Sequence, residues 1–439
     1  MLGRLLRSLY QTSRARGPYD ASACRSTLVA GNLAGAIACY RSYLERRPGD
    51  IEARINLGVA LFRAGDAPGA LIEYEKAAAA EPGSADAWYN AGIVHHVGGR
   101  LDEAEKCYRR ALEADTEHAE ANREFGMMRL ALGDFSAENW RRFSYRRKCQ
   151  GFPHGALAPD ISSWQGEPLA GKSVLVYGEQ GLGDEILFAS CYRDLVNVAD
   201  RCIFVCDPRL VPLLSRLFGD ATVVGFEDAT QALRANCDHL VRAGDLPMMF
   251  RTSPGTFGRG PYLQASLEKR AIWKRRLSAL GPGLKIGLSW RGGTERTGTR
   301  HRSVALPDLR PLLDVPNVHY VNLQYAESSS ERRMCAESLH RELHHWDEAI
   351  DDYDETAALV SELDLTITVT TSVAHLAGAL GQPTWIMANA APRWCYLAAG
   401  RTTPWYPASR IFRQNRAGDW RSVIQEVTDG VRKMASSPS

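Results

Sequence analysis

The stretch SVLVYGEQGLGDEILF, residues 173–188, begins as a β-branched apolar run, passes through a glycine-rich loop and continues as an amphipathic helical segment. A buried strand that turns directly into a helix is the repeating unit of a parallel, doubly wound sheet. Ligands of such sheets bind beside the loops at the carboxyl ends of the strands. The stretch therefore predicts both an α/β fold and the place to look for a site.

Short β-branched runs alternate with helical stretches from this point almost to the C-terminus. The first series ends near HLVRAGD at residues 239–245, and a second opens with KIGLSWRG at residues 285–292. Alternation of this kind indicates parallel sheets. We expect two Rossmann-like, doubly wound halves, at residues 171–282 and 283–435, with a cleft between the carboxyl ends of their strands. A linker that contains Gly and Pro precedes them at residues 151–170.

Before the linker, the sequence repeats with a period of 34 residues. Four columns share this step: Gly31, Gly65, Gly99 and Gly133; Ala36, Ala70 and Ala104; Tyr40, Tyr74 and Tyr108; and Gly58, Gly92 and Gly126. Small residues where paired helices touch, with an aromatic residue in the second helix, resemble the tetratricopeptide repeat. We expect repeat units at residues 16–49, 50–83, 84–117 and, in degenerate form, 118–150, preceded by a basic helix at residues 1–15.

Stacked helix pairs form an α-solenoid, because each pair has an apolar face that it cannot bury alone. The concave groove of a solenoid is suited to holding a peptide or protein. A dimerisation or spacer module is the alternative that the repeats leave open.

The composition excludes several classes of protein. The chain of 439 residues is 45% hydrophobic and 24% charged, as in ordinary globular proteins. Its net charge of +2 provides no field that would draw it to nucleic acid or to an anionic membrane. No apolar run approaches the roughly 20 residues of a membrane span, so we expect a soluble protein.

The ten cysteines include no C-x-x-C pair. We therefore expect buried free thiols in a reducing compartment, and the cytoplasm as the location. We also expect no metal site.

The loop after the first strand holds the candidate general base. Gly181 and Gly183 permit close approach of a ligand, and the start of the following helix favours an anion or an ionised acid. Asp184 in that first turn is placed to take a proton from an attacking hydroxyl, although it would also serve as a helix cap. Glu179 and Glu185 are weaker candidates for the same role.

This loop is a poor dinucleotide fingerprint, because Ile186 occupies the place of the third glycine. The chain also lacks a Tyr-x-x-x-Lys pair, which disfavours a short-chain reductase. A nicotinamide-dependent oxidoreductase is therefore a distant alternative.

Two loops of the second half suit phosphate. The loop at residues 291–303 carries four arginines and one His against one Glu, so that Arg291 and Arg302 can neutralise phosphate through forked donors. A solvated basic loop is the alternative. Thr370, Thr371, Ser372 and His375 mark a second strand-to-helix turn, where hydroxyl and amide groups form a seat for a diphosphate. There the alternatives are an ordinary N-cap and, for the histidine, a packed core residue.

Together these loops place an acid on one half and phosphate-suited groups on the other, facing one cleft. That arrangement suits transfer from a nucleotide-diphosphate donor, bound by the second half, to an acceptor activated by the first. Cationic groups would stabilise the charge that develops on the leaving group.

Four segments carry a resemblance: SWQGEPLAGKSVLVYGEQGLGDEILF, KIGLSWRG followed by RHRSVALPDLRPLL, LDLTITVTTSVAHLAGALGQPTWIM and PWYPASRIFRQNRAGDW. With the repeats, they resemble bacterial tetratricopeptide proteins that carry a family 9, heptosyltransferase-like glycosyltransferase domain. The resemblance implies a GT-B fold, a nucleotide-sugar donor as co-substrate, and inverting transfer without a metal or other cofactor.

The resemblance also implies site residues. The family's Gly-Asp at the start of the first helix supplies the catalytic base, which matches Gly183 and Asp184. Its basic strand-end residue near the donor phosphates corresponds to Arg291 or its loop. Its Asp-Thr/Ser…His-Leu-Ala-Gly motif matches the turn from residue 371 to residue 378, but the family's Asp is Thr370 here. A Thr-Thr pair at a helix start is similar to the phosphate grip of protein O-GlcNAc transferases.

A peptide-holding solenoid joined to such a domain resembles protein O-glycosyltransferases, including those that modify flagellins with nonulosonic acids. We therefore expect a cytoplasmic glycosyltransferase whose repeats hold a protein acceptor. One alternative is transfer to a lipid or saccharide. The other is an inactive tetratricopeptide scaffold, which stays open because Thr370 replaces the family's Asp. The residues do not decide among UDP, GDP, ADP and CMP donors.

Overall fold

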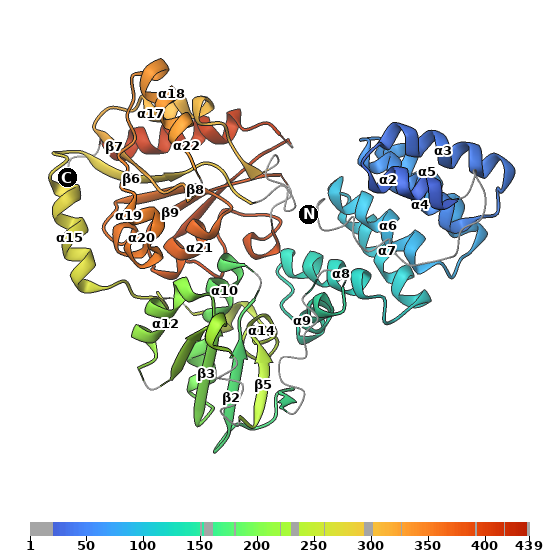
Figure 1. The fold of residues 1–439 in the computed structure, drawn as a ribbon, viewed down its shortest axis with the longest axis horizontal. Coiled ribbons are helices and arrows are strands. Elements are labelled where there is room, and N and C mark those ends of the chain that lie inside the picture. The colour runs from blue at the N-terminus through green and yellow to red at the C-terminus, as the bar shows by residue number, and fades with distance from the viewer. Residues whose placement is uncertain are drawn as a thin grey trace. The chain divides into compact units, whose positions relative to one another are not determined.

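The computed structural model describes residues 21–149, 152, 161–179, 181–219, 221–229, 237–258, 260–293, 302–325, 327–390, 393–416 and 418–436 (Figure 1). These residues form two compact units, one helical and one built on two β-sheets. The expected basic helix at residues 1–15, residues 151 and 153–160 of the expected linker, and residues 294–301 of the arginine-rich loop lie outside the described residues.

Helix pairs build the helical unit, in agreement with the repeat prediction. The pairs are α2 (Ala21–Val29) with α3 (Leu33–Arg46), α4 (Ile51–Arg63) with α5 (Ala67–Ala80), α6 (Ala85–Val97) with α7 (Leu101–Ala114), and α8 (Ala119–Ala131) with α9 (Ala137–Ser144). Glycines in the left-handed region join the helices of each pair: Gly31, Gly65, Gly99 and Gly133, with φ of 80°, 93°, 75° and 84°.

A second glycine column sets the packing within each repeat. A Cβ on Gly58 would lie 2.5 Å from Cε1 of Tyr74, and one on Gly92 would lie 2.7 Å from the same atom of Tyr108. Both tyrosines are buried in the stack. The 34-residue period thus reflects a repeated contact, in which a tyrosine of the second helix packs directly against a glycine of the first.

The cysteine prediction is wrong for one pair. Cys24 on α2 and Cys39 on α3 form a disulfide, with their Cα atoms 5.4 Å apart. Two antiparallel helices bring these residues within bridging distance, which their separation of 15 residues in the sequence does not reveal. The other eight cysteines are buried free thiols, as predicted.

The first sheet is parallel throughout, with the order β1-β5-β2-β3-β4. Its strands are β1 (Ser162–Ser163), β2 (Ser173–Tyr177), β3 (Arg201–Cys206), β4 (Thr222–Gly225) and β5 (His239–Arg242). Strand β1 lies within the segment expected to be a linker. Short helices α10 (Leu182–Ala189), α11 (Tyr192–Val196) and α12 (Val211–Leu217) lie between these strands in the chain, and α14 (Pro247–Phe250) follows β5.

The run DEILFASCYRDLVN at residues 184–197 predicts one amphipathic helix, and the structure forms two, α10 and α11. A buried arginine explains the break, because Arg251 donates a hydrogen bond to the carbonyl oxygen of Ser190, which lies between them. That carbonyl is therefore bound by a side chain that is distant in the sequence.

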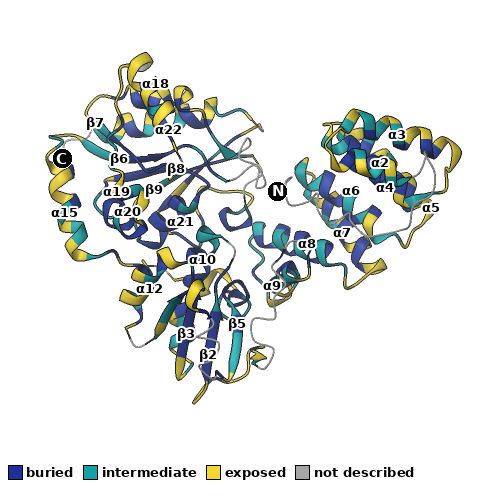
Figure 2. Cartoon of the chain, viewed as in Figure 1, coloured by how far each residue is buried: buried dark blue, intermediate teal, exposed yellow. Residues whose placement is uncertain are grey.

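The second sheet is also parallel, with the order β10-β9-β8-β6-β7. Its strands are β6 (Leu284–Ser289), β7 (Val318–Asn322), β8 (Leu365–Val369), β9 (Thr384–Ala388) and β10 (Ser409–Arg413). The helices of this half are α15 (Leu267–Ser278), α17 (Arg310–Leu313), α18 (Ser329–Leu339), α19 (Glu348–Asp351), α20 (Tyr353–Val360), α21 (Ser372–Ala379) and α22 (Arg421–Ala435). The central strands of both sheets are buried (Figure 2). A tetratricopeptide solenoid followed by two doubly wound halves confirms the predicted GT-B fold class.

The strand orders locate a switch point in each half. In the first sheet, β3 and β5 lie on opposite sides of β2; in the second, β7 and β8 lie on opposite sides of β6. Chain connections leave in opposite directions at such points, and the loops there part to form a crevice. The glycine-rich loop follows β2, and the two phosphate-suited loops follow β6 and β8.

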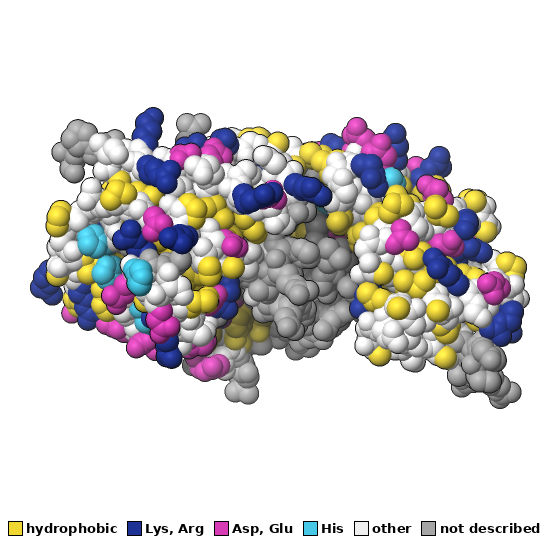
Figure 3. Space-filling view, turned by 90° about the horizontal axis from the view of Figure 1, so that it is seen from above, with side chains coloured by type: hydrophobic (Ala, Val, Ile, Leu, Met, Phe, Trp, Pro, Cys, Tyr) yellow, Lys and Arg dark blue, Asp and Glu magenta, His cyan; other side chains and the backbone are white. Residues whose placement is uncertain are grey.

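The surface shown in Figure 3 carries Lys and Arg interspersed with Asp and Glu. This mixture accords with the small net charge. Within the described ranges, no helix combines the length and the apolar character needed to cross a bilayer.

Candidate functional site

The site lies where α10 of the first half meets α21 of the second. Gly183, in the first turn of α10, faces the first turn of α21 so closely that a Cβ added to it would lie 2.8 Å from Cδ2 of His375. The same Cβ would lie 3.5 Å from Cα of Ser372. Glycine at this position therefore allows the helix starts of the two halves to touch.

Asp184 follows in α10 and reaches across to the second half. Its main-chain N–H bonds the carbonyl oxygen of Gly181, 2.8 Å away, within the helix start. Its carboxylate forms an ion pair with the guanidinium of Arg393, which lies just after β9. The side chains of Asp184 and Arg393 are 20% and 31% exposed, so both are partly open to solvent. The carboxylate raises the pKa of Arg393 and keeps it charged.

Arg302 is the second cation of this site. Its Nε donates to the hydroxyl oxygen of Thr370, 3.2 Å away, and its Nη2 donates to the carbonyl oxygen of the same residue. Burial and the nearby charge of Arg393 lower the pKa of Arg302. Thr370 is thus the contact that ties the arginine-rich loop to the end of β8.

Thr371 caps α21, as expected for a residue at that position. Its hydroxyl oxygen accepts the N–H of Val373 at 3.1 Å, and it also bonds the hydroxyl of Thr368 at 3.1 Å. The carbonyl oxygen of Ser372 accepts a bond from Tyr353 at 3.4 Å. The cap leaves the first turn of α21 directed at α10, with the helix dipole favouring an anion there.

His375 is buried between two tyrosines. Its Nδ1 bonds the hydroxyl of Tyr406 at 2.7 Å, and its Nε2 bonds that of Tyr396 at 3.2 Å. Burial, followed by repulsion from Arg393, lowers the pKa of His375 to about 3. The imidazole is therefore neutral at physiological pH, and both of its nitrogens are engaged by tyrosine hydroxyls.

The side chain of Arg291 points elsewhere. It pairs with Glu331 at 2.8 Å and donates to the carbonyl oxygen of Glu327 at 2.6 Å, both on the α18 side of the sheet. Its main-chain N–H is held by Oε1 of Gln324 at 2.9 Å. The structure brings together Asp184, Arg302, Thr370 and His375 but not the Arg291 guanidinium.

The two weaker acidic candidates have structural contacts. Oε1 of Glu179 accepts the N–H of Gly244 at 3.0 Å, which joins the loops on the two sides of the first switch point. Oε2 of Glu185 accepts the N–H of Asp207 at 2.9 Å. Burial raises the pKa of Glu185 to about 8, so this carboxyl is mostly protonated at neutral pH.

Sequence reasoning missed Arg393, Tyr396 and Tyr406. All three follow β9: Arg393 and Tyr396 lie between two of the segments that carry the family resemblance, and Tyr406 lies within the last of them. One signal was available for the arginine, because it follows a predicted strand in a parallel sheet and so lies at the carboxyl edge.

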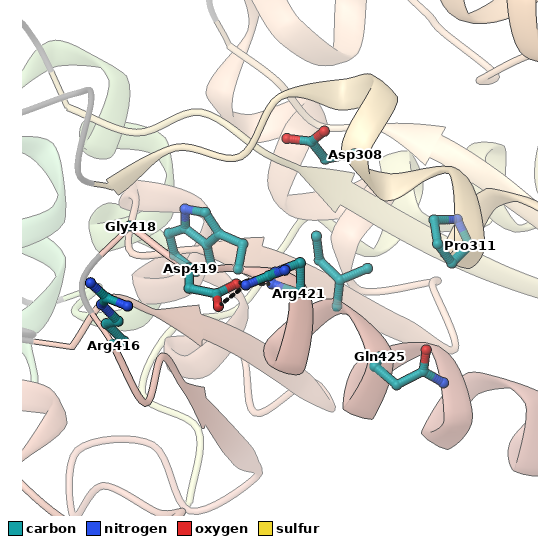
Figure 4. Close-up of a pocket in the computed structure, with 9 residues that line it drawn as sticks. Asp308, Pro311, Arg416, Gly418, Asp419, Arg421 and Gln425 are labelled. Atoms are coloured by element: carbon teal, nitrogen blue, oxygen red, sulfur yellow. Dashed lines mark hydrogen bonds and ion pairs between the residues drawn. The ribbon is translucent and has the colours of Figure 1, made fainter.

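A separate cavity lies at the start of α22, with a volume of about 760 Å³ (Figure 4). Asp308 and Pro311 line one side, and Asp419 and Arg421, which pair at 2.7 Å, line another. Its described lining includes none of the predicted site residues.

Two models of a known protein family match segments of the helical unit. Residues 25–85 and 61–123 match models of the tetratricopeptide repeat. The first repeat domain of Spaghetti (RPAP3), solved with an HSP90 peptide, is 25% identical over 24% of this chain and 83% of its own, with a TM-score of 0.23.

Other relatives extend into the α/β unit. Protein FlbA of Caulobacter vibrioides is 32% identical over 332 residues, which make up 70% of this chain. The chain spans about half the length of that curated relative, 54%. The ADP-heptose lipopolysaccharide heptosyltransferase II of E. coli is 15% identical over 60% of this chain and all of its own, with a TM-score of 0.45.

Proposed function

We propose that this protein is an inverting, metal-independent glycosyltransferase that transfers sugar from a nucleotide-sugar to a hydroxyl group of a polypeptide. The observation that carries the proposal is the ion pair of Asp184 on one half with Arg393 on the other, with a second guanidinium, that of Arg302, held on Thr370 of the same half as Arg393. A base beside a cationic cluster is what transfer from a phosphate leaving group needs.

The reaction forms one bond and breaks another. The Ser or Thr hydroxyl oxygen of the acceptor attacks the anomeric carbon of the sugar, and Asp184 takes the hydroxyl proton. The bond from that carbon to the phosphate oxygen breaks, and its electron pair leaves with the nucleotide. Attack from the face opposite the leaving group inverts the anomeric centre.

On the donor half, Arg302 and the first turn of α21 hold the phosphate. Arg302 lies beside Thr370, and its forked donors suit a phosphate oxygen pair. The main-chain N–H groups at the start of α21, from Ser372 onward, contribute the positive electrostatic potential of a helix N-terminus, which favours the phosphate. Arg291 joins this set only by leaving Glu331, to which it is paired in the structure.

The repeats have the role of binding the acceptor polypeptide. Tetratricopeptide units present concave surfaces that bind extended polypeptides, and the helical unit has the helix pairs for such a surface. We propose a flagellin-like protein as the acceptor, on the basis of the family resemblance.

Thermal denaturation of the full chain with UDP, GDP, ADP and CMP tests the donor site. A ligand at about 100 times its dissociation constant stabilises the fold by roughly 2.7 kcal/mol, a readily measured shift. We expect one nucleotide to stabilise the protein and the variant Arg302→Gln to lose that shift. Arg421→Gln, at an arginine whose side chain is 91% exposed and paired to an aspartate, is the matched control.

The reaction is then tested with sugar conjugates of that nucleotide as donors and flagellin as the acceptor. Transfer that requires residues 21–149 in the same chain supports a protein acceptor. Transfer to lipid or saccharide alone replaces the protein acceptor with that class. A folded protein that binds none of the four nucleotides contradicts the enzyme and favours the scaffold.

A further inference from the structure

The contact between Asp184 and Arg393 conflicts with the part that the proposed function gives to the carboxylate. A general base must offer an oxygen to the hydroxyl proton that it removes. A carboxylate bound to a guanidinium is stabilised in its charged form and is therefore a weaker base. The structure thus shows Asp184 engaged by a partner from the opposite half.

The charges around this pair do not balance. Arg302 and Arg393 lie close enough for the charge of one to lower the pKa of the other, and both also interact with Asp184. His375 is neutral, as its lowered pKa shows, and burial raises the pKa of Cys395 to about 12, so this thiol is neutral too. Among the described residues of this cluster, two positive charges thus face one negative charge.

Arg393 is also placed to serve a ligand on the donor half. It follows β9 at the carboxyl edge of the second sheet, the edge at which α21 and the Arg302 contact lie. Its side chain is about a third exposed, at 31%, while its guanidinium holds Asp184. A phosphate group bound between Arg302 and Arg393 would reverse the excess of positive charge.

We propose that Arg393 is a donor-phosphate ligand that exchanges partners, holding Asp184 in the free protein and turning to the phosphate when the nucleotide-sugar binds. Donor binding then releases the carboxylate, so that the base is available only when a sugar is present. The proposal rests on the proposed function and adds to it a residue and an order of events.

The exchange makes a prediction about binding alone. If Asp184 and the phosphate compete for the same guanidinium, removal of the carboxylate tightens phosphate binding, and the gain disappears when Arg393 is absent. Simple repulsion between Asp184 and the phosphate would give the same gain with or without Arg393. A double-mutant cycle separates the two, because it isolates the energy that passes through the pair.

Titration calorimetry of the full chain with inorganic pyrophosphate, and with UDP, GDP, ADP and CMP, measures this cycle. We expect Asp184→Asn to bind tighter and Arg393→Gln weaker, each by about tenfold, the size of one charge-assisted hydrogen bond. In the Arg393→Gln background, Asp184→Asn is expected to change nothing. Arg421→Gln is expected to bind as the unaltered protein does.

Three outcomes would overturn the proposal. They are an equal gain from Asp184→Asn in both backgrounds, unchanged affinity in Arg393→Gln, and no anion binding by any variant. If Arg393→Gln does not fold, as judged by its melting curve, Arg393→Met replaces it, since methionine keeps an unbranched apolar stem but removes the charge. For that variant too, a full gain from Asp184→Asn would overturn the exchange.

Failure of the proposed function gives a different result. If the double-mutant cycle shows coupling between Asp184 and Arg393 but no sugar is transferred to any acceptor, the partner exchange is supported and the glycosyltransferase proposal is rejected. If sugar is transferred but the effects of the two substitutions on binding are additive, the glycosyltransferase proposal is supported and the partner exchange is rejected.

Discussion

Gly183 of α10 lies against the imidazole of His375 of α21, at a separation that leaves no room for a methyl group. A Cβ on Gly183 would come within 2.8 Å of Cδ2 and 3.4 Å of Nε2 of that ring. The ring cannot retreat easily, because its two nitrogens are bonded to Tyr406 and Tyr396. The packing of the two halves at the site therefore depends on this glycine.

Gly183→Ala is expected to separate the starts of α10 and α21. Overpacking of a buried contact costs typically about 1–3 kcal/mol of the free energy of unfolding. We expect a lower melting temperature and loss of the stabilisation by nucleotide. The control is Gly83→Ala, since nothing lies within 4 Å of a Cβ at that position. Equal behaviour of the two variants would show that the contact is dispensable.

Asp184→Asn is expected to abolish most sugar transfer while nucleotide binding is kept or improved. General-base assistance contributes typically about 10²–10⁴-fold to rate, and an amide cannot provide it. Turnover is measured with saturating donor, and Glu179→Gln is the comparison because Glu179 accepts the N–H of Gly244 within its own half. If the asparagine variant turns over at the normal rate, Asp184 is not the base.

Thr370→Asp is expected to weaken nucleotide binding. An aspartate at this position would pair with the Arg302 guanidinium, which now bonds Thr370, and would compete with phosphate for it. One charge-assisted bond corresponds to roughly a tenfold loss of affinity. Thr370→Ser keeps the hydroxyl and is the control. If the unaltered protein shows no turnover and Thr370→Asp restores it, the unaltered protein is an inactive scaffold rather than an enzyme.

Glu185 gives the fold a pH dependence. Its pKa is raised by burial to about 8 in the folded state, against 4.5 for an unperturbed glutamate. The folded state therefore holds a proton that the unfolded state releases. The resulting stability is complete below about pH 4.5 and is lost as pH rises through about 8.

Glu185→Gln is expected to remove this pH dependence, because the amide does not titrate and its oxygen can still accept the N–H of Asp207. Melting temperatures from pH 5 to pH 9 measure the difference between the variant and the unaltered protein, which we expect to widen toward pH 9. Parallel curves would mean that this carboxyl is not responsible.

Much of the fold could be predicted from local pattern. The helix pairs follow from the glycine and tyrosine columns, since a glycine in the left-handed region ends the first helix and a tyrosine packs on a bare glycine of the partner. The strands β2, β6 and β8 follow from short β-branched runs. β10 was not predicted, because RIFR has an arginine on each side of its apolar pair.

The candidate site was only partly predictable. Asp184, Arg302 and Thr370 each follow or face a strand end, a place that parallel topology makes suited to ligands. Arg291 follows the same rule, but its guanidinium pairs with Glu331, and which acid it meets depends on how α18 packs.

The sequence by itself determined the repeat stack, the two parallel sheets and the edge at which their loops gather. These depend on contacts within one strand, one helix or one repeat. Only the tertiary structure decided that Asp184 meets Arg393, 209 residues away, that Cys24 is joined to Cys39, and that His375 lies between two tyrosines. Such pairs form when separately specified elements pack together, and no local periodicity records which side chains then come into contact.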